Sequence, residues 1–337
     1  MEHTARALRG LGVEVEEHLG PRLPEGSWDV VHGFQLGAQE VAGARRRGVP
    51  VVMSTIYWGL AYTTSGGAGR GSTARDALGR GRRGIRYLTA SLKGREHLSR
   101  LALREMAAEL DQVRAWSTAD LLLPNADGEA QHIREDLGVL TETVVVPNAI
   151  DADLFTPGFD RPRDAGTVLC VGRIEPHKNQ LGTITALRGL PGTSLIVVGP
   201  PHPHHAAYYE QCRRAATGNV TLLPGVDHAD LPALYARHRT HVLASWYETT
   251  GLVSLEAAAS GCTVVTTDRG HAREYFGDDA HYCDPAAPAS IRAAVTSALA
   301  DEPSRRLLDR ITTRYTWADT ARRTLDAYVS ALDRRHA

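Results

Sequence analysis

Two glutamates in the segment from Ser245 to Gly261 lie in a context that indicates a ligand site. The run Thr240–Ala244 predicts a strand, and Gly251–Ser260 predicts a helix, for which Gly261 is a suitable C-terminal cap. Glu248 therefore lies in the loop directly after the carboxyl end of the strand. Ligands of open α/β sheets bind at that end, so Glu248 is a candidate for direct contact with a ligand.

The helix start that follows Glu248 predicts an anion site. The first amides of a helix have no partner inside it, and those of residues 251–254 would point outward, as suits a diphosphate. Gly251 lets a ligand come close to the backbone. Glu256 lies about a turn and a half into the helix. Its carboxylate can accept hydrogen bonds from two adjacent hydroxyls, as a ribose offers.

Two cations follow another predicted strand, Thr167–Gly172. Arg173 comes directly after it, and Lys178 lies in the same loop. Apart from Lys93, Lys178 is the only lysine of the chain, whose other positive charges are arginines. A retained lysine indicates that an ammonium is needed there, because the two side chains are not equivalent. Preset cations stabilise a leaving group that gains negative charge, and they do so more in the transition state than in the ground state.

Short β-rich runs alternate with helical patterns along the chain, which predicts an α/β protein with two doubly wound parallel sheets. Most runs are Val/Leu/Ile stretches without alternation, as expected of strands covered on both faces. The other predicted strands are Asp29–His32, Pro50–Thr55, Ala119–Leu123, Thr143–Val146, Ser194–Gly199, Val220–Leu223 and Cys262–Thr266. The other predicted helices are Thr4–Leu11, Gln35–Arg47, Leu92–Trp116, Asn179–Leu190, Ala206–Ala216 and Ala318–Leu332.

The sequence predicts an N-terminal domain of residues 1–150, a C-terminal domain of residues 151–316, and a C-terminal helix within 317–337 that packs back toward the first domain. Asp151–Gly166 is rich in Pro, Gly and Asp and is interpreted as a linker. The N-terminal domain is expected to be incomplete, because the chain starts with a helix and Leu11–Val15 then predicts the second strand. A missing central strand would leave backbone groups unpaired, so we expect a strand and its Gly-rich loop upstream. The alternative is a sheet closed in another way.

The segment from Ser245 to Gly261 resembles the E-x7-E motif of the retaining GT-B glycosyltransferases of family 4, the "glycosyl transferases group 1" type. Gly172, Arg173 and Lys178 have that family's G-R-x4-K spacing. The resemblance implies two Rossmann-like domains facing a cleft, with the acceptor bound by the first and a nucleotide sugar by the second. The implied catalytic residues are Arg173 and Lys178 on the leaving diphosphate and Glu248 on the donor sugar. The implied donor-binding residues are Gly172, Val226, Thr250, Gly251, Leu252, Val253 and Glu256.

The resemblance is less complete on the acceptor side. His32 ends a D-V-V-H strand that faces the acceptor in the family. Family members usually carry a histidine after the strand matched by Val51–Thr55, whereas Tyr57 and Trp58 follow it here, and Tyr57 is a candidate hydrogen-bonding substitute. In the second domain, Thr250 replaces a common phenylalanine, which bears on sugar preference.

Composition limits the possible partners. The formal net charge of −1 gives no whole-molecule footprint for nucleic acid. The spacing of the four cysteines argues against a disulfide framework or a zinc site. No cofactor and no metal are expected, since the D-x-D sequence at Asp151–Asp153 lies in the linker. No apolar run is long enough to span a membrane, and a cytoplasmic location is expected. Basic residues between Arg70 and Arg104 indicate either an anionic acceptor or lipid headgroups at the inner membrane face, or a solvated arginine-rich surface.

These observations predict a retaining, metal-independent glycosyltransferase of the hexosyltransferase type. It would move a sugar from a nucleoside diphosphate sugar to an unidentified acceptor, either a glycan, a lipid-linked molecule or a small molecule, in carbohydrate or glycoconjugate biosynthesis. One alternative is a nucleotide-sugar epimerase or hydrolase on the same fold. The other is a catalytically inactive relative that binds nucleotide sugars.

Overall fold

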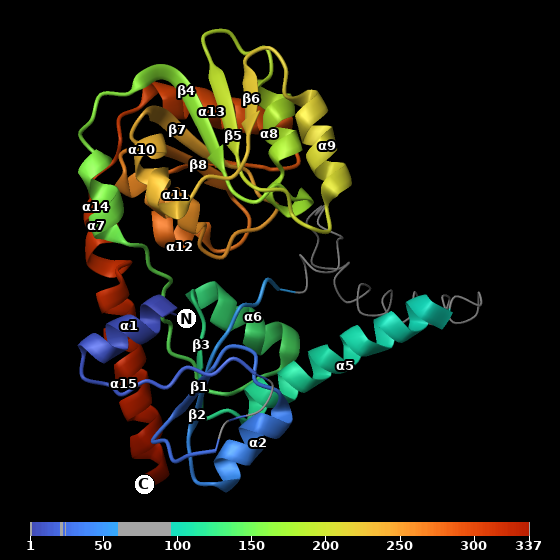
Figure 1. Cartoon of the computed structure of the whole chain (residues 1–337), viewed down its shortest axis with the longest axis vertical. Coiled ribbons are helices and arrows are strands. Elements are labelled where there is room, and N and C mark those ends of the chain that lie inside the picture. Colours follow the sequence, from blue (N-terminus) through green and yellow to red (C-terminus); the bar gives the residue numbers. More distant parts are fainter. Residues whose placement is uncertain (1, 21–22, 24, 60–95, 337) are drawn as a thin grey trace. The chain divides into compact units, whose positions relative to one another are not determined.

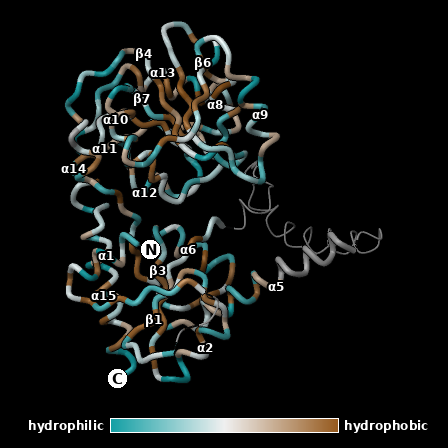
Figure 2. Tube along the Cα trace, in the orientation of Figure 1, coloured by the Kyte–Doolittle hydropathy of each residue, from teal (hydrophilic) through white to brown (hydrophobic). Residues whose placement is uncertain are grey.

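The computed structural model describes residues 2–20, 23, 25–59 and 96–336. The chain forms two compact units (Figure 1). The first unit consists of Met1–Pro147 and Thr320–Ala337, and the second of Asn148–Asp319. In each unit the hydrophobic residues gather around a sheet (Figure 2). None of the helices in the described ranges is both long enough and apolar enough to cross a membrane.

The second unit contains a six-stranded parallel sheet in the order β6-β5-β4-β7-β8-β9. Its inner strands bury Val and Leu side chains, as the sequence predicts for strands covered on both faces, and β7 and β8 bury His and Thr side chains as well. The edge strand β9 was not predicted, because it is short and mixes polar and apolar residues. The strands are β4 Asp164–Val171, β5 Ser194–Val198, β6 Val220–Leu223, β7 His238–Leu243, β8 Thr263–Thr267 and β9 His281–Cys283.

Helices cover both faces of this sheet (Figure 1). On one face, α8 (Gln180–Leu187), α9 (Ala206–Ala215) and α13 (Pro288–Ala300) bury their apolar residues against the strands. The other face carries α10 (Leu231–Tyr235) and α11 (Leu252–Ala259), which packs against α7 (Ala152–Phe155) and α14 (Arg305–Arg314). The strand order reverses at β4, between β5 and β7, and ligands bind beyond the carboxyl ends of strands at such a switch point.

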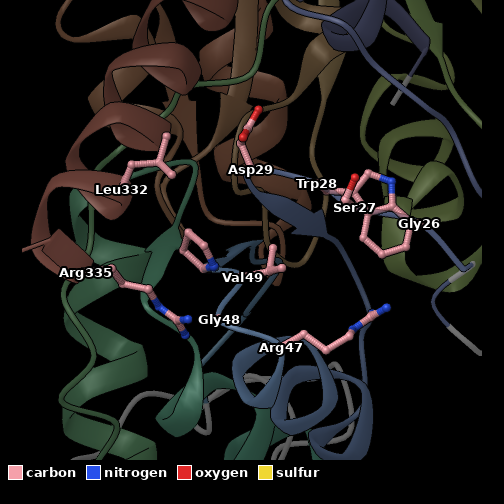
Figure 3. A pocket seen from close by; sticks show the side chains of 10 residues that line it. Gly26, Ser27, Trp28, Asp29, Arg47, Gly48, Val49, Leu332 and Arg335 are labelled. Atoms are coloured by element: carbon pink, nitrogen blue, oxygen red, sulfur yellow. The ribbon is translucent and has the colours of Figure 1, made fainter.

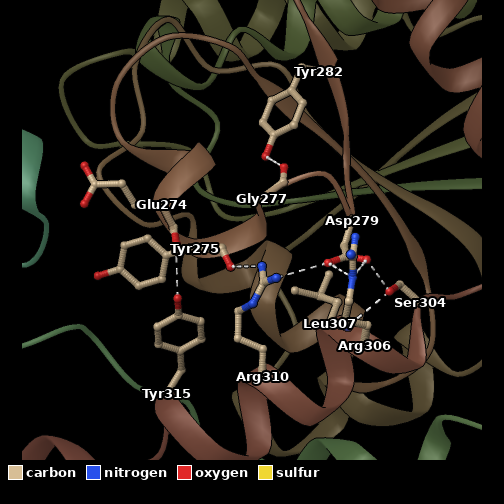
Figure 4. Close-up of polar contacts among 10 residues, drawn as sticks. All are labelled: Glu274, Tyr275, Gly277, Asp279, Tyr282, Ser304, Arg306, Leu307, Arg310 and Tyr315. Atoms are coloured by element: carbon tan, nitrogen blue, oxygen red, sulfur yellow. Dashed lines mark hydrogen bonds and ion pairs between the residues drawn. The ribbon is translucent and has the colours of Figure 1, made fainter.

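A polar network around Asp279 ties α14 to the rest of the second unit (Figure 4). Asp279 follows α12 (Ala272–Phe276) and accepts hydrogen bonds from the Ser304 hydroxyl at 2.7 Å and from Arg306 Nε at 3.0 Å. Arg310 donates both to Asp279, at 3.3 Å, and to the carbonyl of Tyr275, at 3.2 Å. The hydrogen bonds from Ser304 and Arg306 lower the pKa of Asp279, against the opposing effect of its burial.

In the first unit, the described strands form a parallel sheet in the order β1-β2-β3: Val31–Gly33, Val51–Ser54 and Leu121–Leu123. The helices α2 (Ala38–Arg46), α5 (Glu96–Thr118) and α6 (Asp127–Leu137) contribute to the main core. The long helix α15 (Trp317–His336) contributes Ala327 and Ala331 to a second cluster with Val52 and Leu121. The predicted strand Thr143–Val146 is reduced to an isolated bridge between Thr143 and Leu122.

The prediction of a strand at Leu11–Val15 was wrong. After α1 (Glu2–Gly10), the amides of Leu11 and Val13 both donate back to the carbonyl of Leu8, so the chain turns at the end of the helix. Gly12 takes a positive φ of 86°, which favours glycine and breaks an extended run. The segment therefore caps α1. The strand expected upstream of residue 1 lies outside this sequence and stays an expectation.

Candidate donor site

Lys178 and Glu248 lie together at the carboxyl end of the second sheet. Lys178 ends a short 3-10 helix, η2 (Pro176–Lys178), in the loop after β4, and Glu248 lies in the loop after the neighbouring strand β7. The Lys178 Nζ is 2.7 Å from Oε1 of Glu248, and their side chains are only 22% and 7% exposed. Removing either charge would leave the other largely buried without its partner.

The backbone on both sides of this ion pair is held in place. Asn179 adopts a left-handed conformation with φ 54°, and its side-chain amide donates to the carbonyls of Ala244 and Pro285. Glu248 receives a backbone hydrogen bond from His271 and donates one to Arg269. Gly270, between them, has φ 91°, and a Cβ there would lie 2.3 Å from the Glu248 carbonyl oxygen. A side chain at Gly270 would therefore displace Glu248.

The start of α11 follows Glu248, as predicted. Gly251 is its N-cap with φ 77°, and the first intrahelical bonds to Gly251 come from the amides of Ser254 and Leu255. The amides of Leu252 and Val253 thus lie in the helix start and have no intrahelical acceptor. Thr250, just before the cap, is buried, and its hydroxyl accepts a hydrogen bond from the side chain of Asn148 at 3.0 Å. Thr250 therefore anchors the loop within the second unit.

Glu256 lies inside α11 and is 7% exposed. Its Oε2 accepts a hydrogen bond from the hydroxyl of Tyr235 at 3.3 Å, and its Oε1 lies 3.0 Å from Nε2 of His228. Burial raises the pKa of Glu256, and the hydrogen bonds from His228 and Tyr235 oppose that shift. Neither partner was predicted from the sequence.

The remaining predicted donor residues surround this centre more loosely. The Arg173 guanidinium is 62% exposed and lies 3.5 Å from Glu175, which also approaches His202 at 3.7 Å. Gly172 passes so close to Gly199 that a Cβ on Gly199 would meet its carbonyl at 1.9 Å. Val226, in the loop after β6, is 43% exposed. Arg173 and Val226 are thus available to a ligand, whereas the structure does not bring Arg173 into the ion pair of Lys178.

The predicted acceptor-side residues belong to the first unit. His32 lies on β1, where its ring nitrogens are 2.7 Å from the hydroxyl of Tyr328 and 2.8 Å from that of Ser54. Burial lowers the pKa of His32 to about 4, so the ring is neutral at neutral pH. The Tyr57 hydroxyl donates to Asp136, and Trp58 is 37% exposed. His32 and Tyr57 therefore have partners within their own unit.

The chain was compared with known proteins. Residues 155–314 match the family model described as "Glycosyl transferases group 1". Over 243 residues the chain is 32% identical to the glycogen synthase of Mycobacterium tuberculosis, which covers 67% of this chain and 58% of that protein. Over 166 residues it is 34% identical to the D-inositol 3-phosphate glycosyltransferases of Mycobacterium bovis and Mycobacterium tuberculosis, covering 45% of this chain and 35% of those proteins. Residues 155–314 thus belong to the group 1 glycosyltransferases.

Solved structures of similar shape confirm the predicted α/β fold of GT-B type. Sucrose-phosphate synthase of Thermosynechococcus elongatus has a TM-score of 0.70 at 18% identity, over 91% of this chain and 74% of that chain. Anabaena HepE, in complex with UDP and glucose, has a TM-score of 0.61 at 18% identity, over 90% of this chain and 78% of that chain. The chain spans little more than half the length of the first curated relative that it matches.

Two pockets of the chain lie away from the predicted site residues. The first, of about 370 Å³, lies at the amino ends of β1 and β2 and is lined by Trp28, Arg47 and Arg335 among others (Figure 3). The second, of about 260 Å³, is lined by residues around Cys262 and Asp279. Across the residues that the structure describes, no three His, Cys, Asp or Glu side chains come together as a metal site. Of the basic segment Arg70–Arg104, residues 70–95 lie outside the described residues.

Sequence analysis missed Glu129, a completely buried carboxylate of the first unit. It lies in α6 and is 0% exposed. Its oxygens accept hydrogen bonds from the Thr55 hydroxyl, the Tyr57 amide, and both the backbone and side-chain amides of Asn125. Burial raises the pKa of Glu129 to about 7, although these hydrogen bonds act in the opposite direction. The helix α6 was itself not predicted, so the sequence reasoning had no element on which to place this carboxylate.

Proposed function

We propose that the protein is a retaining glycosyltransferase that moves a sugar from a nucleoside diphosphate sugar to an acceptor. The observation that carries the proposal is the 2.7 Å contact between Lys178 and Glu248. The contact places an ammonium and a carboxylate beside the start of α11, at the carboxyl ends of adjacent strands. Family membership supports the same activity.

The geometry suits departure of a nucleoside diphosphate. The bond between the anomeric carbon and the diphosphate oxygen breaks, and that oxygen gains negative charge. Lys178 and the amides of Leu252 and Val253 are preset to stabilise this charge, and Arg173 has the exposure needed to join them. Glu256 accepts hydrogen bonds from the ribose. Glu248 binds hydroxyls of the donor sugar, its carboxylate oriented by Lys178.

The ion pair also supports retention without a protein nucleophile. The Glu248 carboxylate is neutralised by Lys178, and an oxygen engaged at 2.7 Å by an ammonium is a weak nucleophile. The acceptor hydroxyl would then attack on the face from which the diphosphate leaves, and a departing phosphate oxygen would take its proton. Cations and helix amides stabilise the phosphate charge in this proposal, so no metal is required.

The acceptor is proposed only as a class. Names among the similar proteins include sucrose-phosphate synthase and a trehalose-phosphate synthase structure that contains glucose-6-phosphate. Together with the basic segment Arg70–Arg104, these names favour an anionic acceptor, a phosphorylated sugar or polyol in solution or at the inner face of the membrane. A cytoplasmic location would supply nucleotide sugars.

The donor site is tested by thermal stabilisation with UDP, GDP, ADP and their sugars. A ligand at a hundredfold excess over its dissociation constant stabilises the native state by about 2.7 kcal/mol, which is measurable. One base should stand out for the wild type, and Glu256→Ala and Lys178→Ala should lose the effect. A folded protein that responds to none of these ligands would contradict the donor site.

Catalysis and retention require a second assay. Release of the diphosphate from the preferred donor is measured with and without a panel of phosphorylated sugars, and the anomeric configuration of the product is determined by NMR. Acceptor-dependent release with a retained anomer supports the proposal. Acceptor-independent release favours a hydrolase or epimerase, and donor binding without any turnover favours an inactive relative.

A further inference from the structure

His228 occupies the solvent side of the carboxylate that is proposed to bind ribose. It begins the short 3-10 helix η3 (His228–Asp230) after β6, and its Nε2 is 3.0 Å from Oε1 of Glu256. The His228 side chain is 57% exposed, whereas that of Glu256 is 9% exposed. The imidazole thus lies between a buried acceptor and the solvent.

The other described contacts of Glu256 come from the core, so a ligand would approach the carboxylate from the side of His228. Tyr235, which is fully buried, reaches Oε2 from the core at 3.3 Å. The ring of Phe155, also fully buried, packs edge-on against both neighbours, with centroids 5.4 Å from His228 and 6.0 Å from Tyr235. Tyr235 and Phe155 are fixed parts of the core. A ligand that reaches Glu256 must therefore come from the side where the imidazole lies.

We propose that His228 is an internal competitor of the nucleoside: its imidazole holds the Glu256 carboxylate in the unliganded protein and is displaced when ribose hydroxyls bind there. This inference rests on the proposed function, because it takes Glu256 to be the ribose acceptor. Tyr235 holds Oε2 of Glu256, and the imidazole keeps Oε1 of this buried carboxylate hydrogen-bonded while the site is empty. The same contact weakens nucleotide binding, because it must be broken first.

The expected effect is moderate because the imidazole is largely exposed. Exposed contacts between charged or polar side chains contribute little, so removing this one should tighten nucleotide binding by about two- to fivefold. The structure indicates that His228→Ala will fold normally. The described contacts of the His228 side chain are with Glu256 and Phe155, and the next residues continue into α10 through backbone hydrogen bonds.

The test is titration calorimetry of the whole chain with UDP, GDP and ADP. His228→Ala should bind the preferred diphosphate about two- to fivefold more tightly than the wild type, while His228→Gln, which retains a donor, should lie between them. His281→Ala is the matched control. It removes another imidazole–carboxylate contact, to Asp301 at 3.2 Å, from the amino end of β9 in the same sheet. It should leave the affinity unchanged.

The outcomes separate this inference from the proposed function. Equal or weaker binding by His228→Ala, with normal binding by the wild type, overturns the competition and leaves the donor site standing. If neither protein binds any diphosphate, the donor site fails and the inference fails with it. A crystal structure with the bound diphosphate gives an independent reading. His228 should be moved out of hydrogen-bonding distance from Glu256, and an unchanged 3.0 Å contact would overturn the proposal.

Discussion

Each unit buries a glutamate at the carboxyl edge of a parallel sheet, but the partners of the two carboxylates differ. Glu129 of the first unit receives its hydrogen bonds from Thr55, Tyr57 and Asn125, including two backbone amides, and is 0% exposed. Glu256 of the second unit is held by one buried hydroxyl and one exposed imidazole. The comparison teaches that burial alone does not mark a binding residue. What distinguishes Glu256 is that one of its partners, His228, is more than half exposed, as the proposed displacement by ribose requires.

The largest expected effect is on the ion pair at the centre of the second unit. Lys178→Ala should lower the rate of donor turnover by about 100- to 1000-fold, because the leaving group loses its cation and Glu248 is left without a countercharge. The measurement is diphosphate release at saturating donor. This prediction sharpens the comparison, since no cation lies against Glu129 in the contacts that the structure describes.

Lys178→Arg is the matched control for charge. A guanidinium keeps the positive charge but not the point geometry of an ammonium, so activity should recover only in part. Full activity in Lys178→Ala would contradict the role of the ion pair in catalysis. The presence of a cation would then no longer distinguish a functional carboxylate of the second unit from Glu129 of the first.

Truncation of the two buried glutamates should affect different properties, namely the stability of the fold for Glu129 and diphosphate binding for Glu256. Glu129→Ala should lower the free energy of unfolding by about 3 kcal/mol, because several buried donors lose their acceptor. Glu256→Ala should change stability much less but weaken diphosphate binding by about 10- to 100-fold through lost ribose hydrogen bonds. Urea unfolding and calorimetry on both variants test the pair. Similar losses of stability in both would break the comparison.

The local organisation of the second site was predictable from sequence. Apolar runs and bounding glycines fix a strand, a loop and a helix around Glu248, and the observed β7, α11 and β8 confirm them within a few residues. The meeting of Lys178 and Glu248, which lie far apart in the chain, follows from strands β4 and β7 being neighbours. The strand order therefore explains the contact between Lys178 and Glu248, which the spacing within each motif could not predict.

Other features depend on packing that local patterns do not encode. The alternation of Leu11, Val13 and Val15 is as compatible with a strand as with the observed turn. Only the hydrogen bonds to the carbonyl of Leu8 show that the segment turns. The partners of Glu256 come from the loop after β6 and from α10, and no motif links them to α11. Glu129 was overlooked because its donors lie at the ends of two different strands.

A pH titration sharpens the comparison without removing any side-chain volume. Burial raises the pKa of Glu129 from 4.5 to about 7, so between these values the native state binds more protons than the unfolded state. The free energy of unfolding should therefore fall as pH rises, by about 1.5 kcal/mol between roughly pH 5.5 and 7. Urea unfolding of the wild type and Glu129→Gln checks this. The free energy of unfolding should fall with rising pH more steeply for the wild type than for Glu129→Gln. Parallel pH profiles of the two proteins would refute the prediction.

The smallest expected effect comes from a carboxylate of the second unit with the opposite sign of pH dependence. Asp279 has a lowered pKa, owing to its hydrogen bonds from Ser304 and Arg306 despite its burial, so the unfolded state binds more protons in acid. Its contribution to stability is present above the unfolded pKa and is lost as pH falls below it. Asp279→Asn should cost about 1 kcal/mol near neutral pH, because Arg306 is largely exposed and screened. Asp278→Asn, at the exposed neighbouring carboxylate, is the control and should cost much less.

Neither variant should alter diphosphate affinity. A change in diphosphate affinity would mean that α14, which lies far along the chain from Lys178, is coupled to the donor site. The stability of the second unit and its ligand binding could then not be treated as separate properties, as the comparison of Glu129 with Glu256 treats them.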